Sequence, residues 1–249
     1  MAKQSQPQPP TERGSPYARL TLRPLYCLAF IAPLMIFFQI GAMFYRTSLL
    51  APEDLGRLLG YFGATAAYLP PLFIVAVLFI QHLAHGDNWQ VRPGVLAGMA
   101  GESVAWMVPL VAMNLMTGRL LSQAATHGSL QHVYQQILVA VGAGIYEEFI
   151  FRLVFISVVM LVMVDLLGLK KEAVAIGAIL VGAGLFSLYH FSGRQLTSGE
   201  SFPWAEFVFR TLAGVYLGGL YLFRGFAISV GTHTFFNLMV IWMHARGLG

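Results

Sequence analysis

The stretch Gly142-Ala-Gly-Ile-Tyr-Glu-Glu-Phe-Ile-Phe-Arg152 places two adjacent carboxylates, Glu147 and Glu148, inside a long apolar segment. A carboxylate at membrane depth costs roughly 3 kcal/mol on insertion scales, so an acid retained there indicates a function. Arg152 follows Glu148 by four residues, which puts both on one helix face, where the guanidinium can neutralise the acid. Glu147 points about 100° away and has no such partner nearby in the sequence. We therefore interpret Glu148 as structural and Glu147 as the acid available for chemistry.

The composition indicates an integral membrane protein. Of 249 residues, 57% are hydrophobic and 10% are charged, whereas a soluble domain carries about 25% charged residues. The net charge of +4 is spread along the loops and forms no basic face, so nucleic acid is not a predicted partner. Cys27 is the only cysteine, which excludes an intrachain disulfide and a cysteine-rich metal site. We predict neither a metal nor another cofactor.

Residues 1–24 are polar and rich in proline and glutamine, and we predict a disordered N-terminal tail followed by a transmembrane helical domain over residues 25–249. Each apolar segment of this domain is long enough to cross about 30 Å of hydrocarbon. The segments are Leu25–Tyr45, Leu59–Leu83, Val95–Met116, Tyr134–Leu167, Ala173–Phe191, Trp204–Phe223 and Phe226–His244. The pattern predicts an all-α, polytopic membrane bundle.

The fourth segment is too long for a single span. A helix from residue 134 to residue 167 would measure about 50 Å at 1.5 Å per residue. We therefore expect a break near Gly142 and Gly144, with a full span carrying the glutamates after it. Depending on how that break is counted, the bundle has seven or eight helices.

Further polar residues occur in the later segments. His190 ends the fifth segment, and His233 and Asn237 share one face of the seventh because they are four residues apart. A single helical histidine or asparagine is more often a hydrogen-bonded packing residue. One membrane crossing separates Glu147 from His190, which should place both on the same side at similar depth. We expect these four residues to converge on a polar cavity inside the membrane.

This set of side chains suits hydrolysis. A carboxylate can take a proton from water, and an imidazole can position the water or donate to the leaving amine. A histidine and an asparagine can donate hydrogen bonds to a developing oxyanion. No serine or threonine accompanies these residues with a convincing base, which disfavours a serine nucleophile.

Three motifs in order resemble one family. Glu-Glu-x-x-x-Arg at 147–152, Phe-x-x-x-His at 186–190 and His-x-x-x-Asn at 233–237 are similar to the motifs of the CPBP family. This is the CAAX-protease and bacteriocin-processing group, also called the Abi family, which includes Rce1-type prenyl endopeptidases. The resemblance covers roughly residues 134–243, and each motif alone is unspecific, whereas the ordered triple is specific.

The resemblance implies a glutamic-type intramembrane peptidase. Glu147 would be the general base, with His190 helping to activate the water, and His233 and Asn237 would stabilise the oxyanion. The residues implied to support the site are Glu148, Arg152 and Phe186. The implied surroundings are membrane lipid, and the substrate is a peptide or protein, either lipidated or bearing a leader. We expect an integral protein of a bacterial cytoplasmic membrane.

Other interpretations remain open at the level of sequence. Members of the group also resemble non-catalytic immunity or scaffold proteins. A metal-dependent protease could use Glu147, His190 and His233 as ligands, although no His-Glu-x-x-His helix is present. A transporter or receptor is not supported, because helix count does not specify function.

Charged residues also lie elsewhere within the apolar segments. Glu206 and Arg210 are spaced for a structural ion pair, with a place along the substrate path as the alternative. Glu102 has no evident local partner, and we assign it no role.

Overall fold

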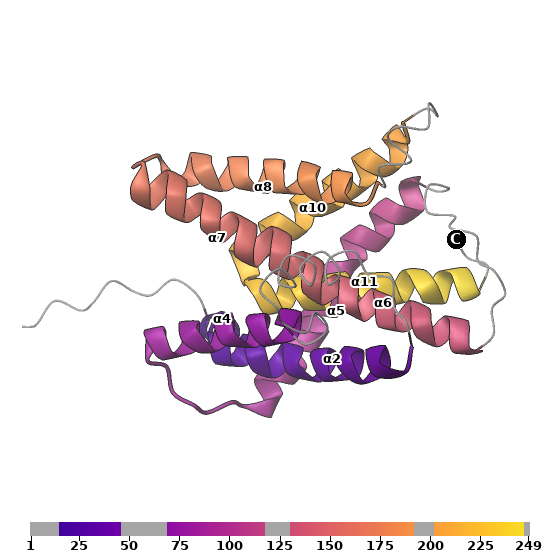
Figure 1. Ribbon diagram of the computed structural model, residues 1–249, viewed down its shortest axis with the longest axis horizontal. Coiled ribbons are helices and arrows are strands. Elements are labelled where there is room, and N and C mark those ends of the chain that lie inside the picture. The colour runs from indigo at the N-terminus through magenta and orange to yellow at the C-terminus, as the bar shows by residue number, and fades with distance from the viewer. Residues whose placement is uncertain (1–14, 46–68, 118–129, 192–201, 247–249) are drawn as a thin grey trace, which may run out of the picture.

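Every regular element in the described part of the chain is a helix. The computed structural model describes residues 15–45, 69–117, 130–191 and 202–246. Figure 1 shows the helices of this bundle, which comprise α-helices and two π-helical segments, η1 and η2. They are α1 (Pro16–Thr21), α2 (Pro24–Phe44), α4 (Leu69–His85), α5 (Pro93–Thr117), α6 (Leu130–Glu148), η1 (Phe149–Val154), α7 (Phe155–Met160), η2 (Leu161–Leu166), α8 (Lys171–Tyr189), α10 (Trp204–Arg224) and α11 (Phe226–Ala245). The predicted all-α bundle is confirmed.

Five helical runs among the described residues are long and apolar enough to cross a membrane. They are Pro24–Phe44, Pro93–Thr117, Val133–Leu166, Lys171–Tyr189 and Phe226–Ala245. Helix α4 is apolar but shorter, and α10 falls outside this group because its charged residues lower its hydropathy. All seven predicted segments coincide with helices, although residues 59–68 of the second lie outside the described residues. The chain is an integral membrane protein.

The predicted break near Gly142 and Gly144 is wrong. Helix α6 continues through η1, α7 and η2 as one run to Leu166, and the junction residues keep right-handed helical angles. Gly144 instead lies against α11, where an added Cβ would collide with Thr234. Its small size therefore allows two helices to approach closely rather than ending one of them. Glu147 consequently lies in the interior of a continuous helical run and not near its start.

Part of the predicted disordered tail is helical. Residues 16–21 form α1, whose first turn is capped where the Ser15 hydroxyl accepts a hydrogen bond from the Ala18 amide at 3.2 Å. The Tyr17 hydroxyl donates to Glu102 at 2.8 Å. Burial and this hydrogen bond raise the pKa of Tyr17 to about 12, so its hydroxyl stays a donor at neutral pH. Residues 1–14 lie outside the described residues.

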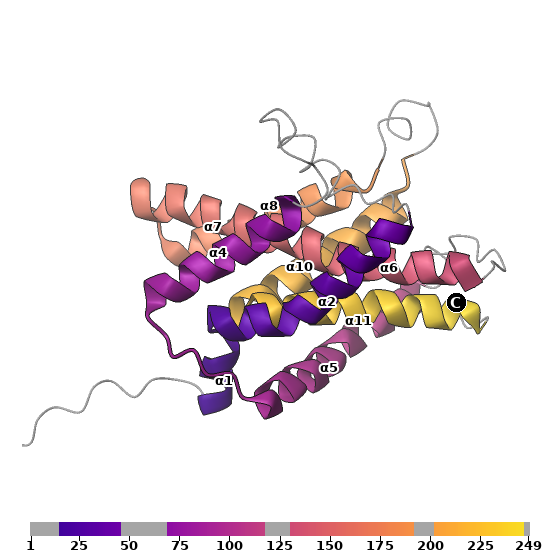
Figure 2. The same cartoon turned by 60° about the horizontal axis from the view of Figure 1, so that its bottom comes forward.

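Helix α11 occupies the centre of the bundle. It packs against α2, α5, α6 and α10, and Figure 2 shows it lying between α2 and α5. In its most apolar window 61% of residues are buried, against 22–33% for the other four candidate spans. A side chain on α11 can therefore contact residues from several other helices at once.

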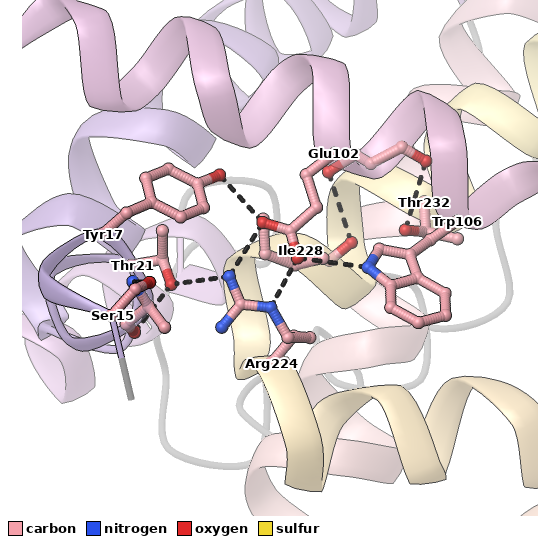
Figure 3. A network of polar contacts seen from close by, with 10 residues as sticks. Ser15, Tyr17, Thr21, Glu102, Trp106, Arg224, Ile228 and Thr232 are labelled. Carbon is pink, nitrogen blue, oxygen red and sulfur yellow. Dashed lines mark hydrogen bonds and ion pairs between the residues drawn. The ribbon is translucent and has the colours of Figure 1, made fainter. Parts of the chain in front are cut away.

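A polar cluster fixes the beginning of α11. Gly225, with φ of +87°, joins α10 to α11 in a conformation that favours glycine. The preceding Arg224 guanidinium donates to Glu102 through Nη2 at 2.8 Å and also through Nε. Its Nη2 also reaches Thr21 Oγ1 at 3.3 Å, and Figure 3 shows this arrangement. Glu102 further accepts from Trp106 Nε1 at 3.1 Å, so this acid does have a partner close in sequence, contrary to our expectation. The cluster joins α1, α5 and α10.

Arg224→Gln should destabilise the fold. The change removes the cation from a Glu102 side chain that is only 19% exposed. Loss of hydrogen bonds to a charged group costs about 1.5–3 kcal/mol. We expect a lower thermal midpoint in detergent, partly restored when Glu102→Gln is added. Arg92→Gln, at an exposed arginine, is the matched control, and an Arg224→Gln midpoint equal to the control's would contradict a stabilising role.

Candidate functional site

The two adjacent glutamates face different neighbours in the interior of the long helical run. Glu147 is 8% exposed and Glu148 is fully buried. Helix α8 approaches from one side through the residues at its end, and α11 approaches from another through its central turns. The two carboxylates therefore differ in most of their partners, although they are consecutive in the chain and both contact His233.

Glu147 lies between two imidazoles. Its Oε1 is 3.5 Å from His190 Nε2, and its Oε2 is 3.9 Å from His233 Nε2. His190 follows directly after α8, and its Nδ1 lies 2.8 Å from the Phe186 carbonyl oxygen. A carbonyl oxygen only accepts, so Nδ1 carries the hydrogen and Nε2 is directed at Glu147. The structure thus places the base predicted from sequence beside both predicted histidines.

Glu148 is the centre of a denser set of contacts. Its Oε1 is 3.1 Å from Arg152 Nη1, which is the ion pair expected from their spacing. The same oxygen accepts from His233 Nδ1 at 2.9 Å, and Oε2 accepts from the Ser229 hydroxyl at 2.5 Å. Sequence reasoning missed both of these contacts. The available signal was that Ser229 precedes His233 by four residues on the same helix face.

Arg152 and Phe186 form the wall behind the histidines. The Arg152 guanidinium lies 4.6 Å from the centre of the Phe186 ring and donates to the Gly214 carbonyl at 3.4 Å. The Phe186 ring also meets the His190 ring edge-on at 4.8 Å and the His233 ring at 6.1 Å. The resemblance implied a supporting position for Phe186, and the structure places its ring against Arg152, His190 and His233. One aromatic ring thereby limits the movement of three site residues.

Asn237 lies at the margin of this group. Its Nδ2 donates to the Ala140 carbonyl at 3.4 Å, and Ala140 precedes Glu147 by seven residues. Further along α6, Gly144 lies against Thr234 and Glu148 contacts His233. The residue numbers rise on α6 as they fall on α11, so the two helices run antiparallel. Asn237 is therefore one helical turn beyond His233, toward the start of α6. The amide carries two hydrogens, so the second stays available for another acceptor.

The charges of the site nearly balance. Glu147 and Glu148 contribute two negative charges and Arg152 contributes one positive charge. Burying the remaining net charge would be expensive unless it were paired. A proton on either imidazole would make the cluster neutral. The arrangement can therefore exchange a proton between a carboxylate and an imidazole without creating an uncompensated charge.

The donor arrangement does not favour a metal site. Within the part of the chain that the structure describes, no group of three histidine, cysteine, aspartate or glutamate side chains is placed to hold a metal ion. Outside the site, the expected pair of Glu206 and Arg210 is present at 3.1 Å, and the Arg210 guanidinium lies 5.2 Å from the centre of the Phe191 ring.

Arg152→Ala should damage folding more than Glu147→Gln does. It would leave Glu148 buried and without its cation, at a cost of about 3–5 kcal/mol. We expect a lower melting temperature and lower expression in membranes. The double variant Glu148→Gln with Arg152→Gln, which removes both charges, should recover part of the loss. An Arg152→Ala protein as stable as the parent would contradict the ion-pair interpretation.

Comparison with known proteins gives a match in the C-terminal half of the chain. Residues 129–239, a little under half of the sequence, match the family described as type II CAAX prenyl endopeptidase Rce1-like. No curated protein and no solved structure matched the chain. The matched segment contains Glu147, Arg152, His190, His233 and Asn237. Through this segment the chain carries a domain of the Rce1-like family, a family of CAAX-protease-like membrane endopeptidases.

Proposed function

We propose that this protein is a glutamic-type intramembrane endopeptidase that hydrolyses a peptide bond with water. The observation that supports this most directly is the position of Glu147, whose two carboxylate oxygens lie 3.5 and 3.9 Å from the Nε2 atoms of His190 and His233. Arg152 neutralises Glu148, which leaves Glu147 as the acid without a guanidinium bound to it. A buried carboxylate beside two imidazoles can act as a general base.

The first step is activation of the water. With its Nδ1 hydrogen directed at the Phe186 carbonyl, a neutral His190 presents an acceptor at Nε2. Glu147 Oε1 is a second acceptor 3.5 Å away, so one water can donate a hydrogen to each. As the water oxygen attacks the peptide carbonyl carbon, Glu147 takes the water proton. The same proton then passes to the leaving amine when the tetrahedral intermediate collapses.

The developing oxyanion needs hydrogen-bond donors. His233 gives its Nδ1 hydrogen to Glu148, so a protonated ring is required to present a second hydrogen at Nε2. The charge balance of the cluster permits this, because one imidazolium, together with Arg152, neutralises the two carboxylates. The Asn237 amide, one turn along the same face, supplies the second donor. Such donors act most strongly where water is excluded.

The substrate is a peptide segment that reaches the interior of the bundle from surrounding lipid. A lipidated C-terminus and a leader peptide both meet this requirement, and a bacterial cytoplasmic membrane is the location we propose. Comparing membrane proteomes from cells with the parent and with a Glu147→Gln variant would identify the peptide that accumulates. Retained cleavage in the presence of a chelator would count against metal-dependent hydrolysis.

Glu147→Gln should abolish cleavage without affecting the fold. The amide cannot accept the water proton, and loss of a general base costs about 10²–10⁴ in rate. The measurement is turnover of purified protein in lipid, with melting temperature recorded in parallel. Glu172→Gln, at an exposed glutamate in the first turn of α8, is the control and should be fully active. Turnover within tenfold of the parent would refute the assignment, and an unchanged biological effect without turnover would favour a non-catalytic partner.

Asn237→Ala should slow the chemical step with little change in apparent substrate affinity. An oxyanion donor acts on charge that exists only in the transition state. Removing one donor costs about 10²–10³ in rate. Single-turnover kinetics would measure this, and the combination with His233→Ala should be less than additive because both serve one oxygen. A normal chemical rate with weakened affinity would instead make this face a substrate-binding surface.

A further inference from the structure

We infer that Ser229 is a positioning residue of this site, which acts on His233 through the carboxylate of Glu148. The inference rests on the proposed function for its consequence in catalysis. Its structural part concerns only the contacts of three buried side chains. Ser229 lies outside the three sequence motifs that point to the site, and none of the comparisons assigns it a role.

Ser229 is placed to bind the second oxygen of Glu148. It is fully buried on α11, one helical turn before His233. Its hydroxyl lies 2.5 Å from Glu148 Oε2 and 3.3 Å from the Leu217 carbonyl oxygen. The hydroxyl has one hydrogen, and an ionised carboxylate is the stronger acceptor. The hydrogen is therefore donated to Glu148.

The two oxygens of Glu148 have different tasks. Oε1 contacts Arg152 and accepts from His233 Nδ1, whereas Oε2 accepts from Ser229. The last torsion of a glutamate side chain has broad preferences, so contacts on one oxygen alone leave the carboxylate plane free to turn. A donor on the second oxygen removes that freedom. Ser229 thus fixes the orientation of the Glu148 carboxylate plane, and with it the position of the oxygen that accepts from His233 Nδ1.

The orientation of His233 follows from this plane. With Nδ1 bound to Glu148, the ring directs Nε2 toward Glu147, 3.9 Å away. Turning the Glu148 carboxylate would move the acceptor away from Nδ1 and allow the imidazole to rotate or exchange its tautomer. Ser229 is itself not in contact with the reacting atoms. It affects the reaction only through the orientation of the His233 ring.

Thr234 offers a matched control on the same helix. It is 1% exposed, and its Oγ1 has no hydrogen-bond partner among the described residues. Thr234→Val removes a buried hydroxyl close to His233 while it preserves side-chain shape. A general disturbance of α11 packing would affect both variants, whereas a positioning role predicts an effect of Ser229→Ala alone.

The first experiment observes His233 directly and needs no substrate. The purified full-length protein, labelled with ¹⁵N-histidine in lipid nanodiscs, would be studied by NMR, and the His233 signals would be assigned from a His233→Gln sample. We expect Ser229→Ala to shift the Nδ1 and Nε2 signals and broaden them, and Thr234→Val to leave them in place. Ser229→Cys, which keeps a similar volume but has a weak donor, should shift them in the same direction if Ser229→Ala does not fold. Unchanged His233 signals in the folded variant would overturn the inference, whatever the outcome for proteolysis.

The second experiment tests the consequence for turnover. For histidines that bind a metal, loss of the partner that orients the ring typically costs about 10–100-fold, and we take that range as the scale for His233. We expect that loss in kcat for Ser229→Ala, with KM within about twofold of the parent, because the affected hydrogen bond acts in the transition state. In a His233→Gln background the same substitution should have almost no further effect. An equal loss in both backgrounds would show that Ser229 does not act through His233.

Discussion

The site depends on the neutralisation of Glu148 by Arg152 inside the helical bundle, where both side chains are buried. Glu148 is fully buried and Arg152 is 2% exposed, so neither charge could be held there alone. The pair holds Glu148 on one face of the helix, and the preceding residue, Glu147, points in another direction. Two consecutive acids thereby acquire different environments, one bound to a cation and one facing two imidazoles. In the proposed mechanism this difference makes Glu148 a structural element and leaves Glu147 available as the base.

Helix α11 provides several of the contacts that give Glu147 and Glu148 different environments. Ser229 and His233, in the central turns of α11, contact Glu148. Thr234 of α11 packs against Gly144 of α6. At the beginning of α11, Gly225 and the cluster of Glu102 and Arg224 set where the helix starts. The Ser103 hydroxyl, beside Glu102, also reaches the Ile228 carbonyl at 3.5 Å, which ties α5 to α11. Polar contacts therefore hold α11 against α5 and α6, which supports the orientation of His233.

A π-helical turn begins directly after Glu148, at Phe149, and contains Arg152. Such turns widen the helix locally and are frequent at functional sites. Here the helical run continues past the site without interruption, and Arg152 still contacts the Glu148 carboxylate four residues earlier. Gly144, which precedes this turn, allows close packing against α11, which explains why a glycine that suggested a helix break lies instead in a continuous helix.

Local information in the sequence determined the membrane location, the helical class, the pairing of Glu148 with Arg152 and the ordered motifs of the Rce1-like family, because each depends on composition or on spacing within one helix. The proximity of Glu147 to His190 also followed from segment order. Only the tertiary structure decided which atoms His233 contacts, that Ser229 binds Glu148, that Glu102 joins three helices and that Asn237 lies beside Ala140. These contacts depend on the relative rotation and depth of packed helices. Residue spacing along one chain does not specify that rotation, since it results from how all neighbouring surfaces fit together.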